Sequence, residues 1–179
     1  MILQKKKNTF IRRIQRFFPN FAIMNISWSE IKPYENELPT NYADRIGRLY
    51  TDTVTAAFKK SNGQFFTPVS IAYFMGRQIS VNKDFISVLD PGCGTAILSC
   101  AVIENLVLQS KVKRIELVTY ETDENLIPGL QKVLEYITMW GMRHNVRIDC
   151  RSYCEDFILS NYSVLYSDCL LYTSPSPRD

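Results

Sequence analysis

The first half of the chain repeats apolar residues at the three- and four-residue steps of an amphipathic helix. This pattern predicts a helix over residues 42–60, followed by Gly63 at a position where glycine often ends a helix. A second helix is expected to begin with Thr67 as its N-cap and Pro68 at its first helical position. The apolar residues that we expect this second helix to bury in the core are Ile71, Ala72, Tyr73, Phe74, Met75 and Ile79.

After Asp84 the pattern becomes typical of strands. Residues 85–89 form a short, nearly continuous apolar run, whereas residues 114–120 and 146–151 alternate between apolar and polar side chains. These three segments are the strands that the sequence predicts.

Helical segments separate the three predicted strands. One is expected over residues 96–108, and another from Asp123 or Glu124 to about Trp140, where Gly141 stops it. Strands that alternate with helices are the signature of a right-handed βαβαβ unit. The sequence therefore predicts an α/β fold with a parallel sheet, preceded by helices.

The chain divides into three parts by composition. Residues 1–41 form an N-terminal basic arm and a proline-containing connector. Residues 42–168 form the folded part, with a helical lead-in over 42–83 and the βαβαβ unit over 84–168. Residues 169–179, CLLYTSPSPRD, contain Ser-Pro-Ser-Pro, which continues neither helix nor sheet. They resemble the in-frame translation of a sequencing adapter, and we interpret them as an artefact of sequence assembly.

The charge is distributed unevenly. Residues 1–29 carry six basic residues and no acid, which leaves 15 of the 21 basic residues against all 18 acids in the rest of the chain. Such an arm suits nucleic-acid phosphates, an anionic membrane surface or a solvated terminus. The sequence has neither a signal peptide nor an apolar run long enough to cross a membrane, so we expect a cytoplasmic protein.

Metal chemistry is not expected. The single histidine is His144, which we expect at the surface, and the five cysteines include no C-x-x-C pair. Cys150 and Cys154 are expected to pack near the third strand as ordinary reduced thiols.

The strongest chemical signal is the segment VLDPGCGTA, residues 88–96, between the first strand and the following helix. Gly92 and Gly94 permit a tight turn and a close approach of the backbone to a ligand. Glu121 ends the next strand, 31 positions after Asp90, so a parallel sheet brings it beside this turn. A carboxylate there can accept hydrogen bonds from both ribose hydroxyls, which indicates a nucleoside cofactor.

The segment GQFFTP, Gly63 to Pro68, followed by DPGCGTA, resembles the adenine-specific DNA methyltransferases of restriction-modification systems. The resemblance implies a Rossmann-like S-adenosylmethionine-dependent methyltransferase fold, here with an incomplete sheet. It also implies S-adenosyl-L-methionine as the cofactor and double-stranded DNA as the partner, in a bacterial or archaeal cytoplasm. Specificity or nuclease subunits are further partners that it suggests.

The family motifs also imply a set of binding residues. Phe66, Thr67 and Pro68 would hold the methionine end of the cofactor, and Glu121 would bind its ribose. Asp156 would meet the adenine amino group, with Phe157 packed near the adenine ring. The residues that match the glycine motif are Asp90, Pro91, Gly92, Cys93 and Gly94. Ala96 stands where the family has a last glycine, and we expect little loss because alanine still permits close packing.

No catalytic residue can be assigned. The family's catalytic motif, Asn-Pro-Pro-Tyr, should follow a fourth strand, which SVLYSD, Ser163 to Asp168, would begin, but the motif is absent from the sequence. We therefore expect an N-terminal fragment that is inactive by itself. The alternatives are an RNA or protein-glutamine methyltransferase, a non-catalytic cofactor-binding module and, more remotely, a nicotinamide-dependent reductase.

Overall fold

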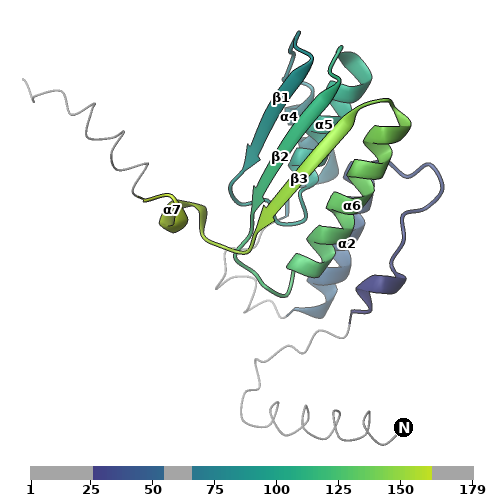
Figure 1. Cartoon of the computed structure of the whole chain (residues 1–179). Helices are drawn as coiled ribbons and strands as arrows, with labels where there is room; N and C mark the ends of the chain where they lie inside the picture. Colours follow the sequence, from purple (N-terminus) through teal and green to yellow (C-terminus); the bar gives the residue numbers. More distant parts are fainter. Residues whose placement is uncertain (1–25, 55–65, 163–179) are drawn as a thin grey trace, which may run out of the picture.

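The three predicted strands form one parallel sheet. The computed structural model describes residues 26–54 and 66–162. In it β1 (Phe85–Asp90), β2 (Arg114–Tyr120) and β3 (Arg147–Tyr153) lie side by side in the order β1-β2-β3. Phe85 pairs with Arg114, and Arg114 pairs with Arg147, so the three strands start and end together (Figure 1). The α/β prediction is confirmed.

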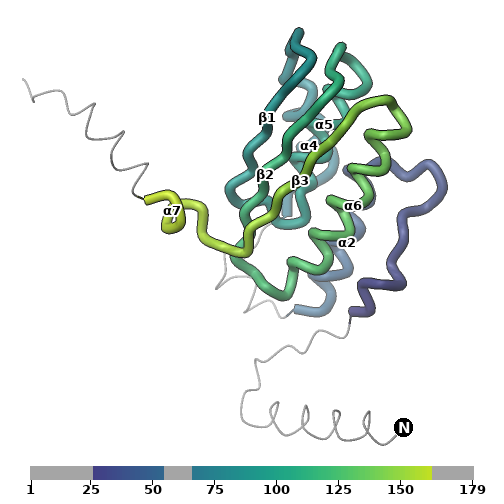
Figure 2. The backbone as a smooth tube through the Cα atoms, viewed as in Figure 1, coloured from purple at the N-terminus to yellow at the C-terminus, as the bar shows by residue number. Residues whose placement is uncertain are grey.

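Helices precede, connect and follow the strands. The structure has η1 (Trp28–Glu30), α2 (Pro39–Thr53), α4 (Val69–Gly76), α5 (Ile97–Gln109), α6 (Ile127–Arg143) and α7 (Phe157–Ser160). The tube in Figure 2 shows α2, α4, α5 and α6 gathered on one side of the strands. The predictions for the basic arm, for Gly63 and for residues 163–179 lie outside the described residues.

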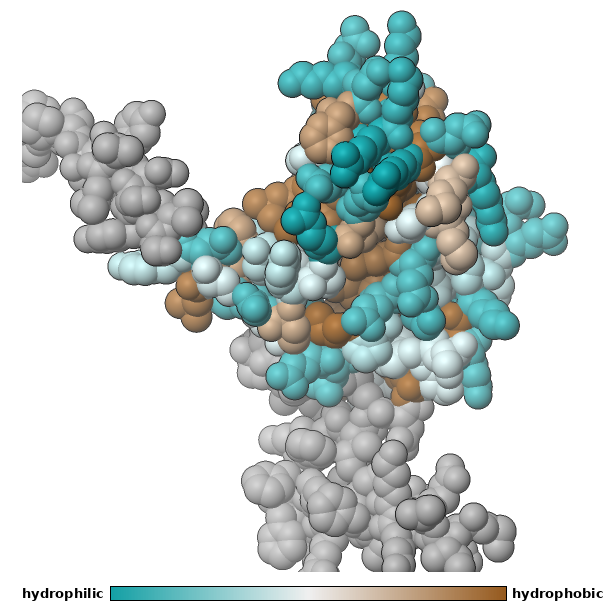
Figure 3. Space-filling model, viewed as in Figure 1, coloured by the Kyte–Doolittle hydropathy of each residue, from teal (hydrophilic) through white to brown (hydrophobic). Residues whose placement is uncertain are grey.

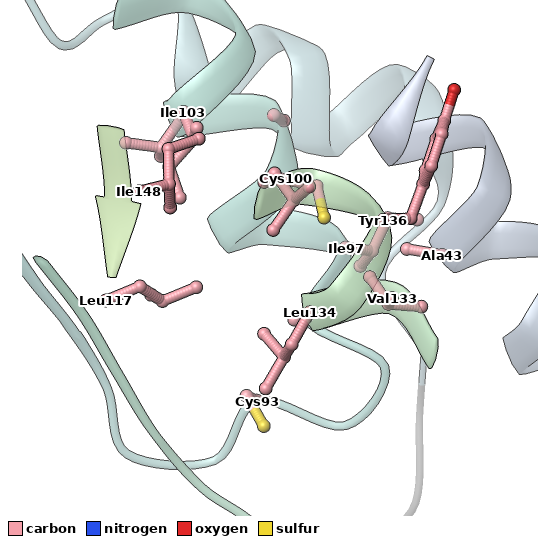
Figure 4. Packing of buried hydrophobic residues seen from close by; sticks show 14 of the residues in the cluster. Ala43, Cys93, Ile97, Cys100, Ile103, Leu117, Val133, Leu134, Tyr136 and Ile148 are labelled. Atoms are coloured by element: carbon pink, nitrogen blue, oxygen red, sulfur yellow. The ribbon is translucent and has the colours of Figure 1, made fainter. Parts of the chain in front are cut away.

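The core lies between this helical layer and one face of the sheet. On β2 the side chains of Ile115, Leu117 and Thr119 are fully buried, whereas those between them are half-buried. Figure 4 shows Leu117 and Ile148 pointing from the strands towards residues of α5 and α6. The burial of β2 side chains therefore alternates because helices cover one face of the sheet, while the other face is open among the described residues.

Helix α2 begins earlier than the sequence pattern predicts. It starts at Pro39, inside the segment expected to be a connector, because proline suits the first helical turn. It ends at Thr53, and the predicted continuation to residue 60 falls largely outside the described residues. The buried face of α2 includes Tyr42, Ile46 and Tyr50.

The prediction for α4 was wrong in two respects. Pro68, not Thr67, is the N-cap, and the helix ends at Gly76, before Ile79. Three of the large apolar side chains expected in the core are exposed instead: Phe74 is 64% exposed, and Ile71 and Met75 are also exposed. The small residues Ala72 and Gly76 are the ones that α4 buries fully, and Tyr73 is half-buried against the core.

The bounds of α6 were also predicted wrongly. The helix begins at Ile127, after a turn over Asp123, and it passes through Gly141 to Arg143. Gly141 is needed for space instead: a Cβ atom there would lie 2.7 Å from Cγ1 of Ile148 on β3. The glycine lets the helix approach the sheet closely and does not end it.

Candidate functional site

The glycine turn leaves β1 at the edge where all three parallel strands end. The backbone N–H of Cys93 donates a hydrogen bond of 3.0 Å to the carbonyl of Tyr120, the last residue of β2. Gly94 has a φ of +55°, a left-handed conformation that glycine adopts without steric cost. The turn is thereby fixed beside the end of β2.

Glu121 holds this turn from the next strand. One carboxylate oxygen, Oε2, accepts a hydrogen bond of 2.9 Å from the N–H of Gly94, and Oε1 accepts one of 2.9 Å from the N–H of Asp123. The structure thus brings Glu121 and the glycine turn together, as their spacing predicts. Each carboxylate oxygen has a second lone pair, so these contacts leave acceptor capacity for a ligand.

Tyr50 is a member of this site that the sequence did not reveal. It appeared only as one apolar position of α2, yet its hydroxyl donates a hydrogen bond to Oδ2 of Asp123. The ring itself is fully buried. A buried tyrosine usually finds a partner for its hydroxyl, and that is the one signal that could have identified Tyr50.

Phe66 joins the site through packing. Its ring lies against both Gly94 and Gly47, at 3.3 Å and 3.5 Å from a Cβ atom placed on either glycine. The same ring makes an edge-to-face contact with Tyr50, with 6.2 Å between centroids. Thr67 is half-buried, and the carbonyl of the exposed Pro68 starts α4 by accepting from Ile71 and Ala72.

The remaining turn residues differ in what they offer a ligand. Pro91 and Gly92 are exposed, and nothing lies within 4 Å of a Cβ atom on Gly92. Asp90 points towards α5 and accepts a hydrogen bond of 2.5 Å from the hydroxyl of Ser99. Burial, with the charges of Asp90 and Glu121, raises the pKa of the Cys93 thiol, so this cysteine stays protonated and is not a nucleophile.

An aromatic cluster lies at the ends of β2 and β3. Tyr120 stacks on Tyr153 with 4.9 Å between centroids, and Phe157 meets Tyr120 edge-on at 5.1 Å. Asp156 is the N-cap of α7, because its carboxylate accepts a hydrogen bond of 2.9 Å from the N–H of Leu159. The predicted pair Asp156 and Phe157 therefore lies beside Tyr120 and Tyr153, which the sequence analysis had not singled out.

A comparison with known families gives a match over the part of the chain that contains the glycine turn. Residues 42–129, which include α2, Phe66, the glycine turn and Glu121, match the N-6 DNA methylase family. These residues are similar to the N-6 DNA methylases.

The curated relatives that this chain matches are longer proteins. The type II methyltransferase M.AccI of Acinetobacter calcoaceticus is 31% identical over 90 residues, which are 50% of this chain and 16% of that protein. The type II methyltransferase M.BsuBI of Bacillus subtilis is 33% identical over 115 residues, 63% of this chain and 22% of the relative. The chain thus spans less than a quarter of either relative.

One solved structure is also similar. It is a Listeria monocytogenes protein described as a class I S-adenosylmethionine-dependent methyltransferase, at 18% identity and a TM-score of 0.37. The similarity covers 74% of this chain and 36% of that one.

Ala96 stands where the family motif has its last glycine, and the difference concerns the backbone conformation. Ala96 is fully buried and has a φ of +60°, in the left-handed region that alanine adopts at a cost of about 1–2 kcal/mol. The expectation of little loss considered only packing. The family's last glycine is explained equally well by this backbone conformation.

Side chains that could bind a metal ion are scattered over the described residues. No group of three or more histidine, cysteine or acidic side chains is arranged around a common point in the described parts of the chain. Cys150 contacts Thr138 on α6, and Nδ1 of the exposed His144 is 2.8 Å from the carbonyl of Trp140. The helices that the structure describes include none suited by length and hydropathy to span a membrane.

Proposed function

We propose that this chain is the cofactor-binding part of an adenine-specific DNA methyltransferase. The full enzyme would transfer a methyl group from S-adenosylmethionine to the exocyclic amine of adenine in double-stranded DNA. The observation that carries the proposal is the contact between the Glu121 carboxylate and Gly94, inside a segment of the N-6 DNA methylase family. Contacts with DNA, and with specificity or nuclease subunits, would belong to the full-length protein.

The residues present fit the proposed cofactor. Glu121 offers free acceptor positions to ribose hydroxyls, and the open space at Gly92 admits a ligand close to the backbone. Phe66 would position the turn for the methionine end, while the cluster of Tyr120, Tyr153 and Phe157 would supply apolar surface to an adenine ring. The bound cofactor would supply an electrophilic methyl group on a sulfonium.

Two of the proposed ligand residues already accept a hydrogen bond within the chain. Asp90 is engaged by Ser99, so we propose that it acts on the cofactor's amino group through the turn that it begins. Asp156 caps α7 through one oxygen, Oδ1, which leaves Oδ2 for the adenine amino group. In both residues the existing hydrogen bond fixes the carboxylate in the orientation from which it would act.

The chain contains no Asn-Pro-Pro-Tyr, so we propose that it binds the cofactor and performs no transfer by itself. In that motif the polar side chain and a backbone carbonyl would orient the target amine, and the aromatic ring would stack on the flipped-out base. None of these groups is supplied by the residues assigned above. The chain provides cofactor binding, and orientation of the target base falls to residues of the full-length enzyme.

The test is cofactor binding by ligand-detected NMR with Glu121→Gln and, as the matched control, the exposed neighbour Glu124→Gln. Hydrogen bonds to a charged group contribute about 1.5–3 kcal/mol, so Glu121→Gln should weaken S-adenosylmethionine binding by roughly tenfold or more. Glu124→Gln should leave binding unchanged. Equal binding by both variants would contradict the assignment of Glu121.

Methyl transfer is measured on the same preparations with tritium-labelled cofactor and double-stranded DNA. We expect no incorporation above background from the wild-type chain. Incorporation would show that catalytic groups are present in these 179 residues. It would contradict the proposal that this chain binds the cofactor but transfers no methyl group by itself.

A further inference from the structure

The outer edge of β3 presents unpaired backbone groups. The N–H of Arg147 donates to Lys113 and the carbonyl of Tyr153 accepts from Glu121, so these residues direct their backbone towards β2. In a parallel strand the intervening residues direct theirs the other way. The groups of Ile148, Cys150 and Ser152 therefore face outwards, and no described strand pairs with them.

A groove runs along this edge between β3 and α6. It has a volume of about 840 Å³, and its apolar lining includes Leu134, Met139 and Ile148. Met139 is 48% exposed. Figure 3 shows apolar side chains in the hollow between β3 and α6, below a polar cluster on the strands. The edge thus combines free hydrogen-bonding groups with apolar surface, the two features that an added strand uses.

The charges on β3 limit the register in which a second β3 strand can pair with this edge. Arg147, Asp149 and Arg151 alternate along the open face of the sheet. In a symmetric antiparallel pair of β3 strands the register is defined by the residue on the two-fold axis. A register centred on Asp149 would oppose two aspartates, and one centred on Arg151 would oppose two arginines, both of which are destabilising.

A register centred on Cys150 is complementary throughout. It opposes Asp149 to the partner's Arg151, and Arg151 to the partner's Asp149. It also opposes Arg147 to the partner's Tyr153, a pair suited to a cation–π contact. The backbone groups of Cys150 meet those of the partner's Cys150, as in a hydrogen-bonded antiparallel pair.

We propose that the β3 edge is a dimerisation surface, on which a second copy of this chain adds its β3 antiparallel in the register centred on Cys150. The two sheets join into one of six strands, and the α6 helices of both copies lie on the same face. Met139 then lies towards the two-fold axis instead of towards solvent. This surface is distinct from the glycine turn, so the inference does not depend on the proposed function.

The test uses two opposite charge reversals, Asp149→Arg and Arg151→Asp. Each variant alone opposes like charges twice across the two-fold axis, so its dimer dissociation constant should rise about tenfold or more. Mixed in equal amounts, the two variants restore both attractive pairs, and native mass spectrometry should show the heterodimer. The pairs within one chain, Asp149 with Arg114 and Arg151 with Glu116, stay broken in the mixture. Rescue therefore reports only contacts between chains.

The control is Arg48→Asp, which reverses an exposed charge in a similar ion pair on α2 and should leave the dimer intact. A monomeric wild-type chain would overturn the proposal. Assembly of any size that is unchanged in the single variants, or a mixture without heterodimer, would overturn it as well. Far-ultraviolet circular dichroism checks that both variants are folded before they are mixed. If either variant fails to fold, the oligomeric state of the wild-type chain and of the folded single variant still tests the proposal.

Discussion

At the scale of single residues, the most informative position is Ala96, which starts α5 in a left-handed conformation. Its side chain is fully buried, so a glycine there loses a packed methyl group but gains an unstrained backbone. The loss of a packed methyl group and the relief of backbone strain thus oppose each other at Ala96 and are of similar size. A comparison with a second buried alanine can separate them.

We expect Ala96→Gly to change the free energy of unfolding little, while Ala101→Gly, in the middle of α5, destabilises by about 1–2 kcal/mol. Both substitutions remove a buried methyl group, so the difference between them measures the relief of strain at Ala96. Urea unfolding of the two variants gives both values. Equal losses would show that Ala96 carries no strain.

Glu104 is a second residue whose environment has a measurable consequence. It is 3% exposed, and its Oε1 accepts a hydrogen bond of 2.5 Å from the N–H of Thr40, in the first turn of α2. Burial raises its pKa, and the hydrogen bond from the N–H of Thr40 only partly opposes that effect. Burial also raises the pKa of Tyr73 to about 12, with a further contribution from the charge of Glu104.

A carboxyl group with a raised pKa in the folded state stabilises the fold most when it is protonated. The wild-type protein should therefore lose stability relative to Glu104→Gln as the pH rises from about 4.3 through the pKa of the folded protein. The loss should approach about 1.4 kcal/mol per pH unit within that window. Urea unfolding at several pH values measures it. The exposed Glu135→Gln should show no such dependence, and a flat difference for Glu104→Gln would refute the assignment.

At the scale of elements, the crossing of α4 and α5 depends on one glycine. A Cβ atom on Gly76 would lie 2.8 Å from the backbone carbon and oxygen of Ala101 and 3.1 Å from the nitrogen of Val102. Backbone atoms of a packed helix cannot yield as a side chain does, so α4 would have to move away from α5.

We expect Gly76→Ala to destabilise the protein by about 1–3 kcal/mol, as overpacked sites commonly do. Gly92→Ala is the matched control, because nothing lies near its added Cβ atom, and it should stay within about 0.5 kcal/mol of wild type. Thermal or urea unfolding gives both values. A stable Gly76→Ala variant would mean that the crossing of α4 and α5 adjusts at no cost.

The strands and the glycine turn could be predicted because their signals are local. β-Branched alternation over residues 114–120 and the DPGCG turn each lie within a few residues of sequence. The exposed Phe74 and the close approach at Gly141 could not be predicted, since both depend on which helix face meets a distant element. The same limit hid Tyr50, whose partner Asp123 is 73 positions away.

At the scale of the whole molecule, a single layer of helices covers one face of the sheet, while the other face carries linked ion pairs. Asp149 pairs with Arg114 and Arg147, and Glu116 pairs with Arg151. Exposed pairs of this kind contribute little to stability, but they make the open face polar over β2 and β3. The glycine turn and the outer edge of β3 thus lie at different borders of the same sheet, while Tyr153 belongs both to the aromatic cluster and to β3.

The order of the strands has a consequence for amide hydrogen exchange. β2 lies between two partners and buries Ile115 and Leu117 completely, so its amides can exchange only when the whole sheet opens. Along β3 in the monomer, slow and fast amides should alternate, with Ile148, Cys150 and Ser152 among the fast ones. The exchange rate of each β3 amide therefore reports whether that amide points towards β2 or towards solvent. Association of two chains through that edge would slow the fast amides and remove the alternation.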